Sequence, residues 1–480
     1  MRGMLPLIAF LLISHAPQDE LQRIDAKGIE ETVKFLASDE LLGRSTGTPE
    51  NELAARHLAK RFEELGLKPA VGESYLQPVP LRRVGEERAA ELDIYVYGGR
   101  MGTHPAGVWF DPIGGASSTE KLRVLTVEGI EDIPLEADAG VALFLSGSSR
   151  QGRKWLTERG HDGGAGWGAV LSRGSKRNGR AWVKRDPRIV LGAPAESAAE
   201  DATPWMRVHG ETRANLEEGH IQFIQLRTYP IDEEVPAHNV AGLIRGVGTK
   251  EQPELAEEVV VLTAHFDHIG VSKRRQSDGE VESEEAEEVD LIRNGADDDA
   301  SGVACVVELA EAFANGPAPA RTLLFLLVTG EEIGLLGTKH YLEAPLFPLE
   351  KTCCNLNYEM IGRADELAGG TGRLWLTGHE RSNLMGAIER EEISISPDLR
   401  PEQNFFERSD NYAFAVRGIV AQTFSTYNMH QDYHQVTDEW DTLDYEHMEV
   451  ASREAYRIAR LVADGEIDPA WLPGGKPRGR

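Results

Sequence analysis

Residues 322–338 read TLLFLLVTGEEIGLLGT, and residues 259–270 read VVVLTAHFDHIG. In both segments a continuous apolar run, typical of a strand buried on both faces, ends in histidine or carboxylate side chains. Parallel strands bring such ends together at one edge of a sheet. The two segments therefore predict a parallel sheet with a functional site at the carboxyl ends of its strands.

The same alternation of strand and helix patterns continues through the second half of the chain. Further strands are expected at 352–358 and 419–424, and helices at 301–313 and 335–342. Such alternation is typical of a sheet covered by helices on both faces. We therefore predict an α/β fold with a doubly wound, mostly parallel sheet flanked by helices over residues 236–465.

Three other segments differ from this pattern, and at 480 residues the chain is expected to form more than one domain. Residues 20–82 are helix-rich, with an amphipathic helix that ends before Gly66, and are expected to be the N-terminal part of the α/β domain. Residues 83–235 are expected to form a mostly β inserted domain, because short β-like runs alternate there with charged, Gly-rich turns. Residues 466–480 are rich in Pro, Gly and Arg, which predicts a flexible tail. The β-like runs are Leu92–Val96, Gly140–Leu145, Ala169–Leu171 and Ile221–Leu226.

The N-terminus and the overall charge indicate where the protein acts and what it does not bind. Residues 1–16 combine Arg2, a short apolar run and a small-residue end, which predicts a signal peptide and an exported protein. No later segment is long and apolar enough to predict membrane anchoring. The net charge of −28 argues against nucleic-acid binding.

An acidic stretch lies between two of the candidate site segments. Eight of the fourteen residues from Ser277 to Asp290 are acidic. The stretch is either a solvated loop or an acidic rim that attracts cationic substrates, and the sequence leaves both open.

His265 and Asp298 are the first two candidate metal ligands. His265 follows an apolar strand, and Asp267 can accept a hydrogen bond from its second ring nitrogen. Asp298 is the middle of three adjacent aspartates in NGADDDASG, which repel one another unless a cation neutralises them. A helix cap or a calcium loop would produce the same motif. We expect Asp298 to bridge two metal ions.

Carboxylates and histidines at three further positions complete the candidate site. Glu331 and Glu332 stand side by side after an apolar run, so we expect Glu332 to bind metal and Glu331 to act as the base. Glu359 ends the next strand, and His434 lies in an acidic loop. His430 lies in the same loop, and we expect it to be a surface residue or a residue behind the ligands. Two imidazoles and three carboxylates suit a pair of zinc ions.

The motifs AHFDHIG, NGADDDASGVA, TGEEIGLLGT and DYHQVTDEWDTLD occur in this order. In these motifs the chain resembles the di-zinc metallopeptidase family of the secreted bacterial leucyl aminopeptidases, glutamate carboxypeptidase and the glutaminyl cyclases. The resemblance covers roughly residues 20–82 and 237–465, and it implies a zinc-exopeptidase-like fold. Residues 83–235 stand where many members carry an inserted protease-associated domain.

The resemblance also implies a role for each candidate residue. One zinc ion would be held by His265, Asp298 and Glu359, and the other by Asp298, Glu332 and His434. Glu331 matches the general acid/base, and Asp267 matches the partner of His265. Glu359 departs from the family pattern, because aspartate is common at this position.

We therefore expect an exported enzyme with two zinc ions per chain that hydrolyses N-terminal residues of a peptide or small protein. A zinc-bound hydroxide would attack, with Glu331 as the general base. The alternatives are a glutaminyl cyclase or a carboxypeptidase of the same fold, or a non-catalytic, receptor-like binding protein. The sequence determines neither the side-chain preference nor the oligomeric state.

Overall fold

The computed structural model describes residues 18–86, 90–97, 99–106, 110–114, 119–161, 164–165, 167, 169–174, 176, 188–192, 204–272 and 290–478. The predicted signal peptide and the acidic stretch up to residue 289 lie outside these residues. The chain divides into two compact units. The first joins the segment that ends at Pro80 to the segment that begins at Pro236, and the second is Leu81–Val235. Within the described residues, no helix is long and apolar enough to cross a membrane.

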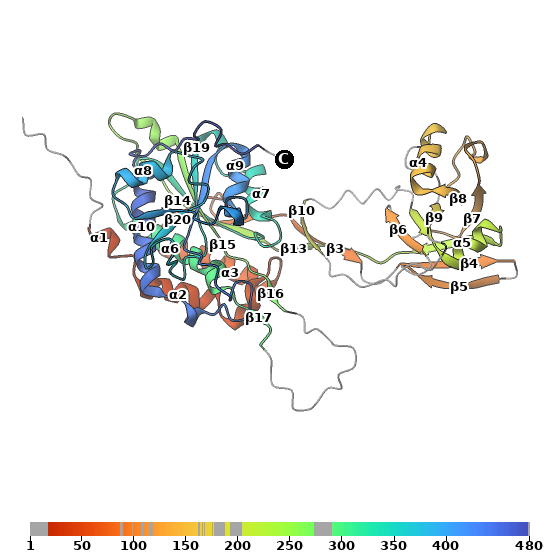
Figure 1. Ribbon diagram of the computed structural model, residues 1–480, viewed down its shortest axis with the longest axis horizontal. Helices are drawn as coiled ribbons and strands as arrows, with labels where there is room; N and C mark the ends of the chain where they lie inside the picture. The colour runs from red at the N-terminus through yellow and green to blue at the C-terminus, as the bar shows by residue number, and fades with distance from the viewer. Residues whose placement is uncertain are drawn as a thin grey trace, which may run out of the picture. The chain divides into compact units, whose positions relative to one another are not determined.

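The first unit is built on a nine-stranded mixed sheet in the order β1-β14-β18-β15-β19-β22-β20-β21, with β2 beside β14 (Figure 1). The central strands β18, β15, β19 and β22 are parallel to one another, whereas β14 and β20 run antiparallel to their neighbours β18 and β22. The bounds are β1 Lys68–Pro69, β2 Leu76–Pro78, β14 His238–Ile244, β15 Val259–His265, β18 Thr322–Val328, β19 Thr352–Tyr358, β20 Leu374–Leu376, β21 Ile395–Pro397 and β22 Val420–Ser425. A separate pair is formed by β16 Gly270–Val271 and β17 Ile292–Arg293.

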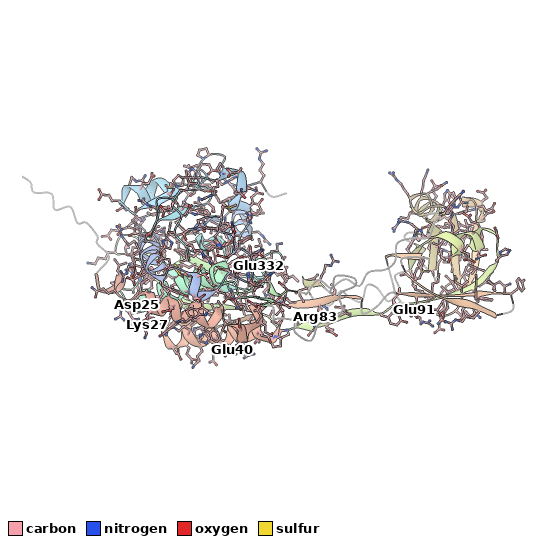
Figure 2. All side chains as sticks on the ribbon, turned by 60° about the horizontal axis from the view of Figure 1, so that its bottom comes forward. Asp25, Lys27, Glu40, Arg83, Glu91 and Glu332 are labelled. Atoms are coloured by element: carbon pink, nitrogen blue, oxygen red, sulfur yellow. The ribbon has the colours of Figure 1, made fainter. Side chains whose placement is uncertain are left out.

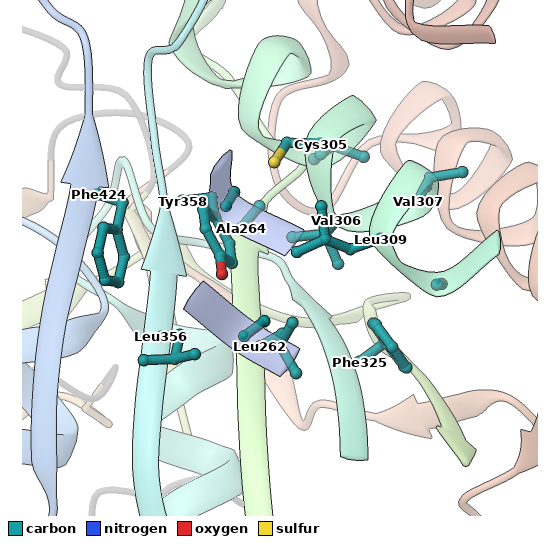
Figure 3. Close-up of a cluster of buried hydrophobic side chains, with 14 of the residues drawn as sticks. Leu262, Ala264, Cys305, Val306, Val307, Leu309, Phe325, Leu356, Tyr358 and Phe424 are labelled. Carbon is teal, nitrogen blue, oxygen red and sulfur yellow. The ribbon is translucent and has the colours of Figure 1, made fainter. Parts of the chain in front are cut away.

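Helices cover both faces of this sheet, which confirms the predicted α/β class. Alternate residues of β15 and β18 pack on opposite layers, as their side-chain period of two requires. Leu262 and Phe325 face the larger helical layer (Figure 3), and Val261 and Leu324 face the smaller one. The larger layer contains α2 Ala26–Leu36, α3 Pro49–Glu64, α6 Gly302–Asn315 and α10 Tyr445–Ala463. The smaller layer contains α7 Leu336–Glu343 and α9 Asn411–Arg417, and the remaining helices are α1 Gln18–Leu21 and α8 Leu384–Arg390.

The N-terminal segment belongs to this unit because it supplies strands and helices to it. Both β1 and β2 pair with β14, and α3 packs its buried face on the same core. The ends of α3 follow from local sequence: Thr48 accepts a hydrogen bond from Asn51 N (3.3 Å), and Gly66 follows the helix at φ +80°. These contacts place residues far apart in sequence in one fold.

Residues 470–475, within the predicted flexible tail, contact the first unit. Trp471 donates its indole N–H to Gly418 O (3.0 Å) and packs against the core. Leu472 N donates to Arg381 O (2.8 Å), and Ala470 N donates to the Asn383 side chain (2.9 Å). The flexibility of residues 466–480 stays a prediction.

The second unit is mostly β. It contains an eight-stranded sheet in the order β5-β4-β12-β7-β8-β9-β11-β6 and a three-stranded sheet in the order β10-β3-β13. The four short strands expected from the sequence correspond to β4, β8, β9 and β12, and only the run that begins at Gly140 starts one residue before its strand. The bounds are β3 Leu81–Glu86, β4 Glu91–Val96, β5 Gly99–Pro105, β6 Phe110–Gly114, β7 Leu122–Val127, β8 Val141–Ser148, β9 Ala169–Arg173, β10 Arg188–Leu191, β11 Trp205–Val208, β12 Ile221–Arg227 and β13 Pro230–Val235, with α4 Ser149–Glu158 and α5 Gly210–Glu217. Its likeness to a protease-associated domain stays a prediction.

One buried carboxyl group in the first unit makes its stability depend on pH. Glu308 of α6 is 1% exposed and accepts a hydrogen bond from Asp25 N (3.3 Å), where α2 begins. Burial raises the pKa of Glu308 to about 8. Because the folded state holds this proton more tightly than the unfolded chain, the cost of ionising Glu308 grows as the pH rises from about 4.5 to about 8.

We therefore expect Glu308→Gln to stabilise the protein at pH 9 and to change it little at pH 4.5. One pKa unit corresponds to about 1.4 kcal/mol, so the gain at pH 9 should be no more than about 5 kcal/mol. Urea unfolding of both proteins at several pH values measures it. Glu31→Gln, at an exposed position of α2, is the control and should show no pH-dependent difference. Parallel pH profiles for wild type and Glu308→Gln would contradict the assignment.

Candidate metal centre

The candidate ligands come from neighbouring parallel strands of the first unit. β15 ends at His265, β18 is followed by Glu331 and Glu332, and β19 is followed by Glu359. Because β18, β15 and β19 are adjacent and parallel, their carboxyl ends lie side by side. Figure 2 marks Glu332 within this unit.

Asp298 lies at the centre of the group. His265 Nε2 is 3.2 Å from Asp298 Oδ1, and His434 Nε2 is 3.0 Å from Asp298 Oδ2. His434 Nε2 is also 3.4 Å from Glu332 Oε2. Each oxygen of Asp298 thus faces a different histidine, as a carboxylate that bridges two metal ions would. Glu359 lines the same pocket as Asp298, Glu331 and Glu332.

Asp267 is placed differently from the sequence expectation. The second ring nitrogen of His265, Nδ1, lies 3.2 Å from the backbone carbonyl of Asp267 and 3.8 Å from its carboxylate. The carboxylate instead accepts hydrogen bonds from Glu331 N (3.1 Å) and from the Thr46 hydroxyl (2.8 Å). Asp267 therefore orients His265 through its carbonyl and holds the backbone of Glu331 through its side chain.

The buried carboxylates differ in charge state. Burial raises the pKa of Glu331 well above its usual range, and the nearby Glu359 adds to this effect while His265 opposes it. Burial also raises the pKa of Glu359 to about 7. Burial acts in the same direction on Asp298, but His265 and His434 hold its pKa well below the usual range. These shifts favour the ionised form of Asp298 and the protonated form of Glu331. The pKa of Glu332 is also lowered, because burial and the charge of Asp298, which raise it, are outweighed by His268 and His434.

Several buried polar atoms of the site have no hydrogen-bond partner among the described residues. They include His265 Nε2, His434 Nε2 and Glu332 Oε1. Buried nitrogen and oxygen atoms without partners are costly unless a cation binds them. Imidazole and carboxylate are the ligands that zinc prefers, so these residues fit a zinc centre.

Arg44, which is not among the residues predicted from the sequence, contacts the backbone of the turn at Asp298. It is fully buried, and its guanidinium donates to the backbone oxygens of Phe266 (2.7 Å), Gly295 (2.7 Å) and Asp298 (3.4 Å). Arg44 thus ties the HFDH loop to the aspartate turn. Its position in LGRST contains no sequence signal for this role, because the contacts span more than 200 residues.

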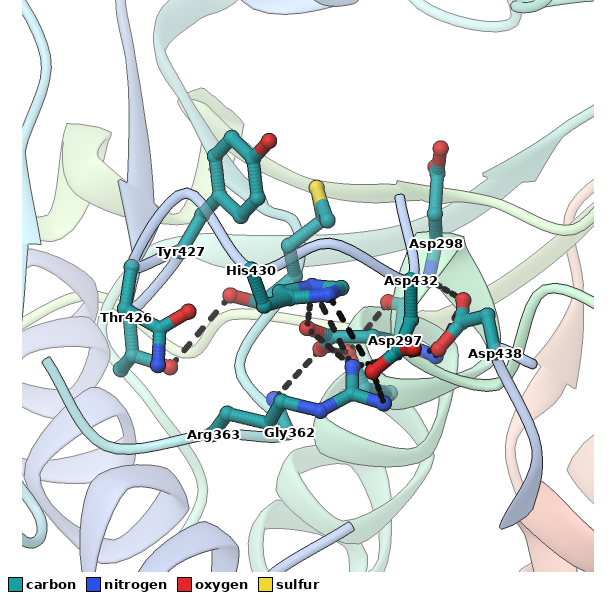
Figure 4. Close-up of polar contacts among 12 residues, drawn as sticks. Asp297, Asp298, Gly362, Arg363, Thr426, Tyr427, His430, Asp432 and Asp438 are labelled. Carbon is teal, nitrogen blue, oxygen red and sulfur yellow. Dashed lines mark hydrogen bonds and ion pairs between the residues drawn. The ribbon is translucent and has the colours of Figure 1, made fainter. Parts of the chain in front are cut away.

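A cluster of charged residues connects Asp298 to the loop that carries His434 (Figure 4). Asp438 accepts from Asp297 N (3.0 Å) and Asp298 N (3.2 Å), and it pairs with Arg363 (3.1 Å). His430 Nε2 is hydrogen-bonded to Asp297 (2.9 Å). The Asp298 side chain points away from this cluster in Figure 4, so the cluster holds its backbone and leaves its carboxylate free. His430 thus lies behind the ligands, one of the two placements expected from the sequence.

A pocket adjoins the candidate ligands. Its walls combine the carboxylates with aromatic rings, hydroxyl groups and one guanidinium. The lining residues are Asp298, Glu331, Glu332, Glu359, Met360, Trp375, Thr377, Phe405, Arg408, Ser409, Thr423, Ser425, Tyr427 and Tyr433. The pocket could take an apolar or aromatic side chain next to the carboxylates.

Comparison with known proteins gives a consistent family. Residues 239–459 match the family described as Peptidase family M28. A probable zinc metalloprotease of Pyricularia oryzae is 33% identical over 156 residues, which is 32% of this chain, and the chain spans only about a quarter (26%) of that relative. This family is the one that the motifs predicted.

Two solved structures are also similar to the chain. The aminopeptidase from Aneurinibacillus sp. strain AM-1 is 17% identical with a TM-score of 0.47, and 96% of this chain and 97% of that chain are covered. A zinc aminopeptidase from Bacillus subtilis is 17% identical with a TM-score of 0.47, over 95% of this chain and 98% of that one.

Proposed function

Since residues 239–459 match the family described as Peptidase family M28, we propose that the protein is an exported di-zinc aminopeptidase. The observation that carries the proposal is the approach of His265 and His434 to different oxygens of Asp298, with Glu332 3.4 Å from His434. These atoms are buried, and the two histidine nitrogens have no hydrogen-bond partner within the described part of the chain. Asp298 would bridge the ions. His265 and Glu359 would complete one site, and Glu332 and His434 the other.

Zinc bound there would lower the pKa of a water molecule to near neutrality and polarise the scissile carbonyl. The protein itself supplies the proton transfer. Glu331 lines the same pocket as the ligands, and its raised pKa suits a group that takes a proton from water and returns it to the leaving amine. The hydrogen bond from Glu331 N to Asp267 (3.1 Å) holds this residue at the end of β18.

Export is the second part of the proposal. Its support is the apolar run and small-residue end within residues 1–16. The proposed substrate is a peptide or a small protein with a free N-terminus. The pocket beside the carboxylates could take the side chain of its terminal residue.

A substrate panel tests the reaction class. We expect hydrolysis of aminoacyl p-nitroanilides with a free amine and no hydrolysis of the N-acetylated forms. Dialysis against a chelator should abolish the activity, and two equivalents of zinc should restore it, because the site depends on the metal for its charge balance. Cleavage of N-blocked substrates at an equal rate, or activity that survives removal of metal, would contradict the proposal.

A carboxypeptidase is the second candidate, and one residue favours it. Arg408 lines the pocket, and its side chain is exposed. Within the described residues it donates to Tyr433 Oη (3.4 Å) and lies over the Phe405 ring, with no carboxylate in ion-pair distance. A guanidinium in this position could bind a terminal carboxylate. Peptides with a blocked N-terminus and a free C-terminus separate the two candidates, because only a carboxypeptidase would shorten them.

A further inference from the structure

His268 is a third histidine at the metal centre. It is the second histidine of HFDH and is 1% exposed. Its Nδ1 lies 2.7 Å from Glu332 Oε1 and 4.0 Å from Asp298 Oδ2. The ligand atoms of His268, Asp298 and Glu332 all lie within 4.8 Å of one another.

The short contact between His268 and Glu332 is not an aligned hydrogen bond. Among the described residues, neither His268 Nδ1 nor Glu332 Oε1 has a hydrogen-bond partner, although the two atoms are 2.7 Å apart. The ring N–H direction therefore does not point at this oxygen. The Nε2 atoms of His265 and His434 show the same combination of a close carboxylate and no hydrogen bond.

Two other histidines of this region each form a ring hydrogen bond. His430 Nε2 is hydrogen-bonded to Asp297 at 2.9 Å, although its Nδ1 has no partner among the described residues. Both ring nitrogens of His447 have partners, Gly372 N (2.7 Å) and the Thr426 hydroxyl (3.2 Å). His268 differs from both, because neither of its ring nitrogens has a hydrogen-bond partner among the described residues.

The separations around Glu332 and Asp298 suit donors that share one ion. Zinc–nitrogen and zinc–oxygen bonds of about 2.1 Å place neighbouring donors of a tetrahedral site about 3.4 Å apart. The nitrogens of His268 and His434 lie 2.7, 3.0, 3.4 and 4.0 Å from oxygens of these two carboxylates. The average of these four nitrogen–oxygen separations is close to the distance of about 3.4 Å expected between neighbouring donors of one zinc ion.

The backbone and the packing hold the His268 ring in this orientation. His268 N donates to Arg44 O at 3.5 Å, which places the residue beside the loop that ends at Arg44. A Cβ atom at Gly295 would lie 2.5 Å from His268 Cγ, so the ring packs against the bare backbone of this glycine. Arg44 in turn donates to Gly295 O (2.7 Å). These contacts hold the ring in place beside Glu332.

We propose that His268 Nδ1 is a fourth protein donor to the zinc ion held by Asp298, Glu332 and His434. The inference rests on the proposed metal centre, and it makes the two positions unequal. One position has four protein donors, and the other has His265, Asp298 and Glu359. Closed zinc sites serve structure, whereas catalytic sites keep an open position. The four-donor position therefore retains its ion more tightly, and the three-donor position is the one that exchanges metal and binds substrate.

The proton NMR spectrum of the protein loaded with two Co²⁺ ions tests this assignment without an activity measurement. Each histidine bound to Co²⁺ gives one strongly shifted, exchangeable ring N–H signal. Wild type should show three such signals, and His268→Asn should show two. His220→Asn, at an exposed position of the second unit, is the control and should keep three.

Zinc affinity gives a second readout. Competition with a chromophoric chelator should show that His268→Asn and His268→Ala weaken one zinc site at least about tenfold and leave the other unchanged. Added imidazole should restore the weakened site in His268→Ala. Two shifted signals in wild-type protein, or two zinc sites of unchanged affinity in both variants, would overturn the assignment. Wild-type protein that shows three signals yet cleaves no peptide would instead overturn the proposed function.

Discussion

Glu331→Gln is expected to lower kcat by about 10²- to 10⁴-fold, the range that a general acid–base group contributes. The amide keeps the shape of the side chain but cannot take a proton from water. Glu331 donates its backbone N–H, not its side chain, to Asp267, so the substitution leaves that hydrogen bond in place. We therefore expect the zinc content and KM to stay close to the wild-type values while kcat falls. Steady-state kinetics together with metal analysis of the dialysed protein measures both.

A matched variant shows that the loss is specific to this carboxylate. Glu343→Gln makes the same chemical change at the exposed end of α7, and its kcat should equal that of wild type. Retention of most of the activity in Glu331→Gln would remove Glu331 from the mechanism. A variant that lost its zinc would indicate that Glu331 is a ligand instead.

Asp298→Asn is expected to abolish activity through loss of metal. An amide has one oxygen and no charge, so it cannot bridge two ions, and the remaining carboxylates would balance less of the metal charge. We expect the variant to retain at most one zinc ion per chain after dialysis and to have no measurable turnover. Metal analysis and chelator competition on the purified variant give the result.

The exposed Asp441→Asn is the control for the same change of charge. It should keep two zinc ions and full activity. Two tightly bound zinc ions in Asp298→Asn would contradict the bridging role. A fall in metal content in both variants would point to an effect of net charge, which the salt dependence of zinc binding would reveal.

The central parallel strands β15, β18, β19 and β22 could be predicted from the sequence because they are buried on both faces. The expected strand at 352–358 is β19, and the strand expected at 419–424 lies within one residue of β22. Periodicity alone does not separate such short buried runs from a helix, but their length and their flanking turn residues favour a strand. The same physical rule placed candidate ligands at the ends of β15, β18 and β19, where parallel strands bring them together.

The roles of individual polar groups could not be predicted in this way. Sequence pattern left His430 and His434 as alternatives in one loop, and His268 received no role at all. His430 is hydrogen-bonded to Asp297 through Nε2, whereas neither ring nitrogen of His268 has a partner in the described residues. Hydrogen-bond satisfaction depends on neighbours that are distant in sequence.

The sequence by itself determined which residue types stand at the carboxyl ends of the parallel strands, because hydrophobic periodicity is local and is written in consecutive residues. Only the tertiary structure decided what those groups contact. The carboxylate of Asp267 binds Thr46 and the backbone of Glu331, and Arg44 reaches the turn at Asp298. These contacts join segments separated by as many as 254 residues, where no local pattern exists. Packing therefore selects the charge state and the orientation of residues whose positions the sequence had already set.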